Sequence, residues 1–135
     1  MATNIDIVRT GYESFCRGDI QTTRAMFAED IEWLEPRWAP GGATCLFRGR
    51  DQVLRRIFAP GPEVHDARAL DAREFYGDGD TVIVTGVFHA SAGAASDLID
   101  VPFAHVWTVH AGRIDSLRAY NDVHEMVALH APRLV

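Results

Sequence analysis

The first part of the chain repeats its apolar residues at the spacing of a helix. The residues that recur every three or four positions are Ile5, Val8, Tyr12, Phe15 and Cys16. This pattern predicts an amphipathic helix over residues 3–17, which Gly18 would end. The carboxylate of Asp19 can accept the free amide hydrogens of a first helical turn, so a second helix is expected over residues 20–28.

A short strand, a loop and a third helix are expected next. Residues 30–35 alternate between apolar and polar positions like a strand. The residues on one side of this strand are Ile31, Trp33 and Glu35. Residues 36–44 contain two prolines and a pair of glycines, which indicates a loop, and residues 49–58 are expected to form the third helix.

From residue 63 onward the period of the pattern changes from 3.6 to 2, the period of a strand. The expected strands cover residues 63–75, 80–91, 98–110 and 112–121. Glycine-containing breaks between them suit turns between antiparallel neighbours, and a last helix is expected over residues 122–130. Helices followed by a run of strands indicate an α+β fold, in one domain over residues 1–135.

Composition excludes several classes of partner. Asp and Glu outnumber Lys and Arg by 19 to 13, so no basic surface for nucleic acid is expected. No apolar run approaches the ~20 residues that cross a bilayer, and the N-terminus lacks the apolar core of a signal peptide. Cys16 and Cys45 have no metal-like spacing. Reduced thiols in a cytoplasmic protein are expected, and a disulfide between the two cysteines is left open.

A histidine between aromatic residues is the first candidate for chemistry. The large residues that share one face of the strand 98–110 are Phe103, His105, Trp107 and Val109. An imidazole in an apolar pocket can act as an acid, a base or a hydrogen-bond donor near neutral pH. The alternative is a core or interface histidine that hydrogen-bonds to a backbone carbonyl.

Several short motifs occur in order along nearly the whole chain. They are Arg17-Gly-Asp-Ile20, Phe27-Ala-Glu-Asp-Ile-Glu-Trp33, Phe47-Arg-Gly-Arg50, Pro102-Phe-Ala-His-Val-Trp107, and Gly112-Arg-Ile114 followed by Tyr120-Asn-Asp122. Together they resemble the nuclear-transport-factor-2-like superfamily, and within it the SnoaL-like group of polyketide cyclases and ketosteroid isomerases. The resemblance implies a cone, in which a curved antiparallel sheet packs on three to four helices and encloses an apolar pocket. This fold hosts both enzymes and non-enzymes.

The resemblance also implies roles for particular residues. His105 matches the position where ketosteroid isomerases carry a protonated aspartic acid of the oxyanion hole, and Glu35 matches their catalytic aspartate base. A carboxylate in an apolar pocket suits proton transfer between carbons, because its charged form is disfavoured there. The alternative for Glu35 is an exposed carboxylate that pairs with Arg37 or Arg48. Ala119 stands where cyclases and epoxide hydrolases carry an essential aspartate, which counts against both of those mechanisms.

These observations favour a protein that binds a small apolar molecule in an internal pocket, with no metal or cofactor. Isomerase-like or cyclase-like acid–base chemistry on that molecule is left open as the enzyme hypothesis. Glu35 is then the base, and His105 polarises a carbonyl or enolate oxygen. The residues expected to line the pocket are Trp33, Phe103, Trp107 and Asn121.

The alternative function is a non-catalytic ligand-binding or dimer-scaffold protein of the same fold. A homodimer through the sheets is expected in either case, since proteins of this group commonly dimerise in that way. The apolar residues expected on the sheet face opposite to the pocket are Val82, Val84 and Phe88.

Overall fold

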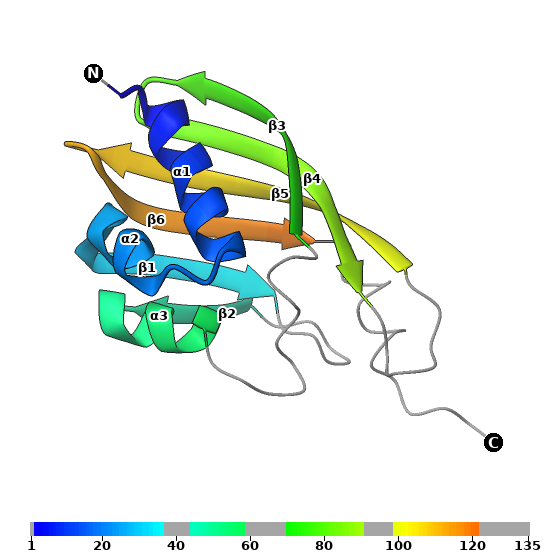
Figure 1. The fold of residues 1–135 in the computed structure, drawn as a ribbon, viewed down its shortest axis with the longest axis horizontal. Coiled ribbons are helices and arrows are strands. Elements are labelled where there is room, and N and C mark those ends of the chain that lie inside the picture. Colours follow the sequence, from blue (N-terminus) through cyan, green and yellow to red (C-terminus); the bar gives the residue numbers. More distant parts are fainter. Residues whose placement is uncertain (1, 37–43, 59–69, 91–98, 122–135) are drawn as a thin grey trace.

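Three helices lie on one face of a six-stranded sheet in the part of the chain that the structure describes (Figure 1). The computed structural model describes residues 2–36, 44–58, 70–90 and 99–121. The elements in chain order are α1 (Asn4–Cys16), α2 (Ile20–Met26), β1 (Phe27–Pro36), β2 (Thr44–Arg48), α3 (Arg50–Phe58), β3 (Leu70–Asp78), β4 (Thr81–Ala90), β5 (Ile99–His110) and β6 (Arg113–Asn121). The predicted α+β class is confirmed.

The first two helices begin where local side chains cap them. The Thr3 hydroxyl accepts a hydrogen bond from the Asp6 amide, and the Asp6 carboxylate accepts one from the Thr3 amide, both at 3.1 Å. Gly18, with φ of 71°, separates α1 from α2. Asp19 caps α2 as predicted, and hydrogen bonds from the hydroxyl and amide of Thr22 lower the pKa of its carboxyl. No helix in the described ranges is long and apolar enough to cross a bilayer.

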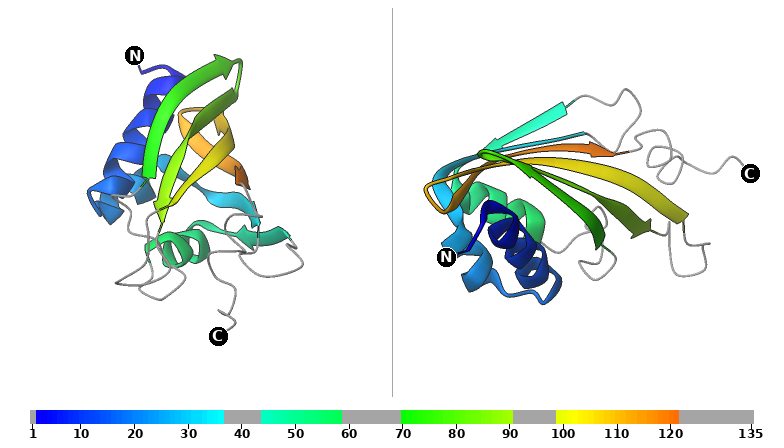
Figure 2. Two further views of the ribbon diagram at one scale, coloured as in Figure 1. Left: turned by 90° about the vertical axis from the view of Figure 1, so that its right-hand side faces the viewer. Right: turned by 90° about the horizontal axis from the view of Figure 1, so that it is seen from above.

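The sheet is mixed and open. Its strand order is β2-β1-β6-β5-β4-β3, and every neighbouring pair is antiparallel except β1 and β6, which run parallel. The expectation of a wholly antiparallel sheet is therefore wrong for this pair. β1 comes before the meander of strands and joins its last strand with the same direction (Figure 1). β2 and β3 are the two edges, so the sheet curves around the helices without closing (Figure 2).

The predicted strand ranges hold best for β4, β5 and β6. β3 continues to Asp78, three residues beyond the predicted end of its strand, and the turn to β4 lies at Gly79 and Asp80. β2 was not predicted, because its five residues follow a stretch rich in proline and glycine. Residues 63–69, 91 and 98 of the expected strands and the expected last helix at 122–130 lie outside the described residues.

The core lies between the helices and the inner face of the sheet. Its side chains with at most 1% exposed surface include Val8, Ile31, Val53, Val82, Val84, Val109 and Ile114. The expectation that Val82, Val84 and Phe88 face away from the site is wrong. The cross-strand partners of Val82 and Val84 are Trp107 and His105, on the helix-covered face, and Phe88 packs against the same core. Both faces of β4 carry apolar residues, so alternation alone did not indicate which face is covered.

Candidate functional site

The residues proposed from the sequence lie in rows across the inner face of the sheet. In the first row, Trp33 on β1 stands level with Leu117 on β6, and Leu117 stands opposite Trp107 on β5. The two indole rings approach each other edge to face, with their centroids 5.6 Å apart. Both tryptophans are more than nine-tenths buried. This row forms one aromatic side of the candidate site.

The next row contains the two candidate catalytic residues with one small residue between them. His105 stands opposite Ala119 on β6. Leu34 pairs with Arg118, so the next step along β1 and β6 brings Glu35 level with Ala119. Adjacent strands lie about 4.8 Å apart, which puts the backbones of Glu35 and His105 roughly 10 Å from each other. Because the side chain of Ala119 is a single methyl group, it does not fill the space between Glu35 and His105. Larger neighbouring side chains or a ligand can occupy that space.

His105 lies among aromatic rings and hydrogen-bonds to a side chain. Its Nδ1 is 2.5 Å from the hydroxyl of Tyr12 on α1. The same hydroxyl accepts a hydrogen bond from the indole N–H of Trp107 at 2.9 Å. Phe103 and Tyr12 stack on the imidazole, with centroids 4.2 Å and 5.9 Å away. The partner of His105 is therefore a side chain and not a backbone carbonyl.

Burial determines the protonation of both groups in this hydrogen bond. It lowers the pKa of His105 from its ordinary value of 6.5 to about 3, and it raises the pKa of Tyr12 well above its ordinary value near 10. Near neutral pH the imidazole is uncharged and the phenol keeps its proton. A neutral imidazole has one N–H donor and one acceptor nitrogen, so His105 can donate a hydrogen bond without carrying charge.

Glu35 is held by two neighbours on the inner face. The Nε of Arg56, on α3, donates to Oε1 of Glu35 at 2.6 Å. The side chains of this pair are 26% and 16% exposed, respectively, so the pair is largely shielded from water. The indole N–H of Trp33 makes a longer hydrogen bond to Oε2, at 3.4 Å. Oε2 is therefore the less engaged of the two carboxylate oxygens.

Phe103 and Asn121 form the third row, beyond His105. Phe103 stands opposite Asn121 on β6 and opposite Gly86 on β4. A Cβ atom at Gly86 would clash with the backbone oxygen of Asp71 and lie 2.7 Å from the Phe103 ring, so the backbone and the ring both require glycine here. Asn121 is partly buried at the end of β6. The four residues expected to line a ligand thus share the sheet face of His105.

Two contributors to this arrangement were not identified from the sequence. Tyr12 was assigned only to the apolar stripe of its helix, although a buried tyrosine hydroxyl usually has a hydrogen-bond partner, and that signal was available. Arg56 carries no sequence pattern that links it to Glu35. Of the two partners considered instead, Arg48 pairs with another carboxylate of β1 at 3.5 Å, and Arg37 lies outside the described residues.

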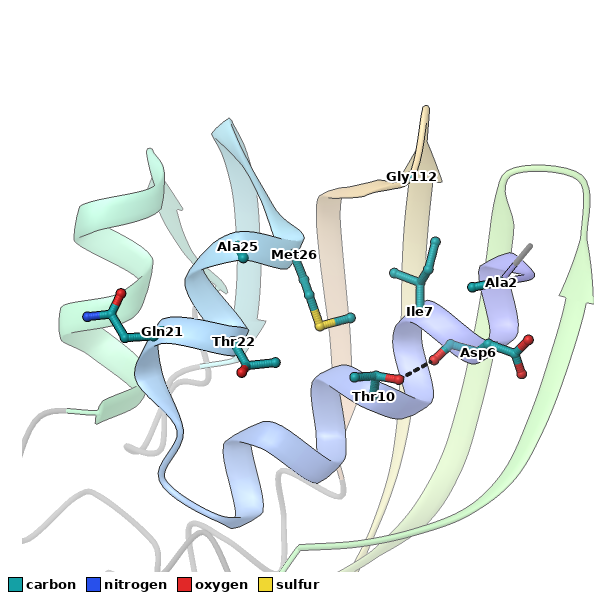
Figure 3. Close-up of a pocket in the computed structure, with 9 residues that line it drawn as sticks. All are labelled: Ala2, Asp6, Ile7, Thr10, Gln21, Thr22, Ala25, Met26 and Gly112. Atoms are coloured by element: carbon teal, nitrogen blue, oxygen red, sulfur yellow. Dashed lines mark hydrogen bonds between the residues drawn. The ribbon is translucent and has the colours of Figure 1, made fainter.

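A separate cleft of about 460 Å³ lies between α1 and α2 (Figure 3). Its lining consists of Ala2, Asp6, Ile7, Thr10, Gln21, Thr22, Ala25, Met26 and Gly112. None of the candidate site residues lines it, and the Asp6 carboxylate is already engaged in capping α1. An apolar pocket at the inner face stays a prediction. Within the described ranges, no three His, Cys, Asp or Glu side chains gather as metal ligands would.

Comparisons with known proteins agree with this architecture. A family model for the SnoaL-like domain matches residues 8–117. The crystal structure of an NTF2-like protein from Burkholderia thailandensis is 28% identical, with a TM-score of 0.81 over 98% of this chain and 100% of that chain. An uncharacterised protein of Mycobacterium tuberculosis is 26% identical over 118 residues, which are 87% of each chain.

A structure from Jannaschia classed as a SnoaL-like polyketide cyclase shares the fold at 17% identity. Its TM-score is 0.74, over 96% of this chain and 93% of that chain. The matched family model covers most of the chain, including β1 and β5, and ends before Ala119 and Asn121. The chain therefore belongs to the SnoaL-like family and has the NTF2-like fold.

Proposed function

We propose that this protein binds a small apolar molecule on the inner face of its sheet and transfers a proton on it. The observation that carries the proposal is the environment of His105. This ionisable group is kept uncharged among aromatic rings, one small residue away from Glu35. Aromatic walls with a few polar groups are typical of sites for small apolar ligands, in which the polar groups fix the orientation of the ligand.

In this proposal Glu35 is the base and His105 binds an oxygen atom of the substrate. Arg56 occupies Oε1 of the carboxylate, which leaves Oε2 as the oxygen that takes a proton. The neutral imidazole donates a hydrogen bond to a carbonyl, and to the enolate that forms when the neighbouring carbon loses its proton. The ligand itself would lie over Ala119, between these two side chains.

Ala119 separates this proposal from the chemistry of cyclases and epoxide hydrolases. The resemblance places an essential aspartate of those enzymes at this position, whereas alanine has no proton to give. The likeness to the Jannaschia structure concerns the fold alone. Isomerase-like proton transfer, which needs one base and one oxygen-binding donor, is therefore the favoured reaction class.

A second function, ligand binding without chemistry, is favoured by two observations. Glu35 is engaged in a hydrogen-bonded ion pair with Arg56, and no carboxylate stands at Ala119. Both are expected of a protein that keeps the shape of the family's site and serves as a ligand-binding protein or a dimer scaffold. A non-catalytic ligand-binding protein would share ligand binding with the enzyme and would move no proton, whereas a dimer scaffold would need neither.

Binding over Ala119 should be detectable with a simple ring ketone. We expect α-tetralone to change the tryptophan fluorescence of the protein, because Trp33 and Trp107 lie beside the proposed site. The substitution Ala119→Leu fills the space between the other two side chains of its row. It should weaken binding by about 10-fold or more, which corresponds to roughly 1.4 kcal/mol. A fluorescence titration of the full chain measures both affinities.

The matched control is Ala25→Leu, which makes the same change at an exposed position of α2 in the lining of the separate cleft. It should leave the affinity for α-tetralone unchanged. Loss of binding in Ala25→Leu with binding retained in Ala119→Leu would place the ligand in that cleft. A wild-type protein that does not bind α-tetralone would contradict the proposal for ring ketones.

We also propose that two copies of the chain associate through the outer faces of their sheets. Tyr76 and Ile83 are cross-strand partners on this face, and Tyr120 lies on it two strands away. Their exposed fractions are 53%, 38% and 52%, respectively. Exposed apolar surface of this kind often marks a protein–protein contact.

The expected mass by light scattering at tens of micromolar is twice that of the single chain. Placing a charge in the contact with Ile83→Glu should shift the protein toward the single-chain mass, because an unpaired buried carboxylate is costly. Ile20→Glu is the matched control, since Ile20 is 44% exposed on α2, on the helix side of the sheet. A wild-type protein with the single-chain mass would count against the dimer.

A further inference from the structure

One hydroxyl group on the inner face stands between two ring nitrogens. The Tyr12 hydroxyl accepts a hydrogen bond from the indole N–H of Trp107 at 2.9 Å and lies 2.5 Å from Nδ1 of His105. Tyr12 and Trp107 are only 8% and 6% exposed, so these groups depend on one another for hydrogen bonding. The three side chains form a hydrogen-bonded chain in which each proton has a defined place.

The positions of these protons follow from the donors and acceptors that are present. An indole N–H can only donate, so it occupies one lone pair of the Tyr12 oxygen. Among the described residues, His105 is the only other partner of that oxygen, and therefore the acceptor available to the phenol hydrogen. The reverse arrangement, in which Nδ1–H donates to the hydroxyl, leaves the buried phenol hydrogen without an acceptor. An unsatisfied buried donor costs about 1–3 kcal/mol.

We propose that Tyr12 is a positioning residue that fixes His105 in the tautomer with its proton on Nε2, so that the site selects ring compounds bearing an acceptor oxygen. Nε2 hydrogen-bonds to none of the described residues, so its N–H has no partner in this part of the protein and can donate to a ligand. A carbonyl or enolate oxygen can accept this bond. An ammonium group has no lone pair to offer, and a plain hydrocarbon gains nothing from it.

The choice of ligand class rests on the proposed function, whereas the tautomer does not. It also limits what His105 can do. With Nδ1 occupied by the phenol hydrogen and Nε2 protonated, the ring has no free lone pair with which to remove a proton from a substrate. The imidazole then donates a hydrogen bond to the oxygen of the substrate, and Glu35 is the group that removes the proton.

The tautomer can be read directly by nitrogen NMR of the isotope-labelled full chain without any ligand. At neutral pH the expected spectrum of His105 shows a protonated Nε2 and an unprotonated, hydrogen-bonded Nδ1. Tyr12→Phe removes the donor, so the Nδ1 signal should lose its hydrogen-bond shift and the tautomer preference should weaken. Tyr120→Phe, the same substitution at a 52% exposed position of the outer face, should change neither signal.

A wild-type spectrum with a protonated Nδ1 would overturn the proposal, and this result does not depend on whether any variant folds. A Tyr12→Phe variant with an unchanged His105 spectrum would also overturn it. For the ligand class, α-tetralone should shift the Nε2–H signal, whereas tetralin, which lacks the oxygen, should not. If α-tetralone binds but the Nε2–H signal does not shift, His105 is not the group that donates a hydrogen bond to the oxygen of the ligand. No binding at all would contradict the proposed function and the ligand class, while the tautomer would still be decided by the ligand-free spectrum.

Discussion

Replacing Glu35 by glutamine should slow proton transfer by about 10²-fold or more, the usual contribution of a positioned acid–base group. The amide has the size of the carboxylate and can still accept the hydrogen bond from Arg56. It has no second carboxylate oxygen to take a proton, so ligand binding should survive while the reaction slows. Proton transfer can be measured by NMR as exchange of the hydrogens beside the carbonyl group of α-tetralone in heavy water.

The matched control for this prediction is Glu32→Gln. Glu32 lies on the same strand, is exposed, and pairs with Arg48 away from the candidate site. This variant should exchange the hydrogens of α-tetralone at the wild-type rate. If Glu35→Gln also keeps the wild-type rate, Glu35 is a bystander and His105 has no catalytic partner. A wild-type protein that binds α-tetralone without exchange above background would favour the non-catalytic binding function.

Acidification should destabilise the fold through His105 before most carboxylates are protonated. In the unfolded chain its imidazole titrates near pH 6.5, whereas burial lowers the pKa in the folded protein to about 3. Below pH 6.5 the unfolded chain therefore takes up a proton that the folded chain does not, so the free energy of unfolding falls with pH until about pH 3. The loss from pH 7 is about 2 kcal/mol at pH 5 and about 3 kcal/mol at pH 4, at ~1.4 kcal/mol per pKa unit.

Urea unfolding at a series of pH values measures this loss. The variant His105→Asn should lack it, although its stability at pH 7 will also differ from that of the wild type. His110→Gln, at a histidine whose side chain is 73% exposed, should keep the wild-type pH dependence. Contributions from carboxylates are common to all three proteins and cancel in the comparison. Equal slopes for the wild type and His105→Asn would mean that the folded protein does not hold a neutral, buried imidazole.

The helices, and the set of β5 residues that share one face of the sheet, could be predicted from the sequence because local rules determine them. The capping carboxylate of Asp19 and the alternation of Phe103, His105 and Trp107 are properties of neighbouring residues. Strand direction is not such a property, and nothing in β1 indicates that it runs parallel to β6. The orientation of β4 was also not predictable, since apolar residues occupy both of its faces.

The residues of the candidate site stay a prediction, and their contacts could not be predicted from the sequence. Strand parity and the family resemblance put His105 forward, and the resemblance put Glu35 forward, but the partners of both come from helices. Tyr12 reaches His105 from α1, and Arg56 reaches Glu35 from α3. Such contacts depend on how each helix is rotated against the sheet. A periodic sequence indicates which side of a helix is buried, but not which buried side chain meets which strand residue.

The parallel pairing of β1 with β6 has a consequence for how the protein is made. The paired residues lie roughly 85 positions apart, and contacts between such distant segments slow folding. During synthesis β1 emerges from the ribosome long before β6. Until β6 has been made, the apolar side chains of Ile31 and Trp33 on β1 lack the strand that pairs with β1. Tyr12 and His105 are 93 positions apart, so their hydrogen bond cannot form before β5 has been made. The sheet and the candidate site are therefore complete only once β6 has been synthesised, and a chain that ends before β6 would lack both.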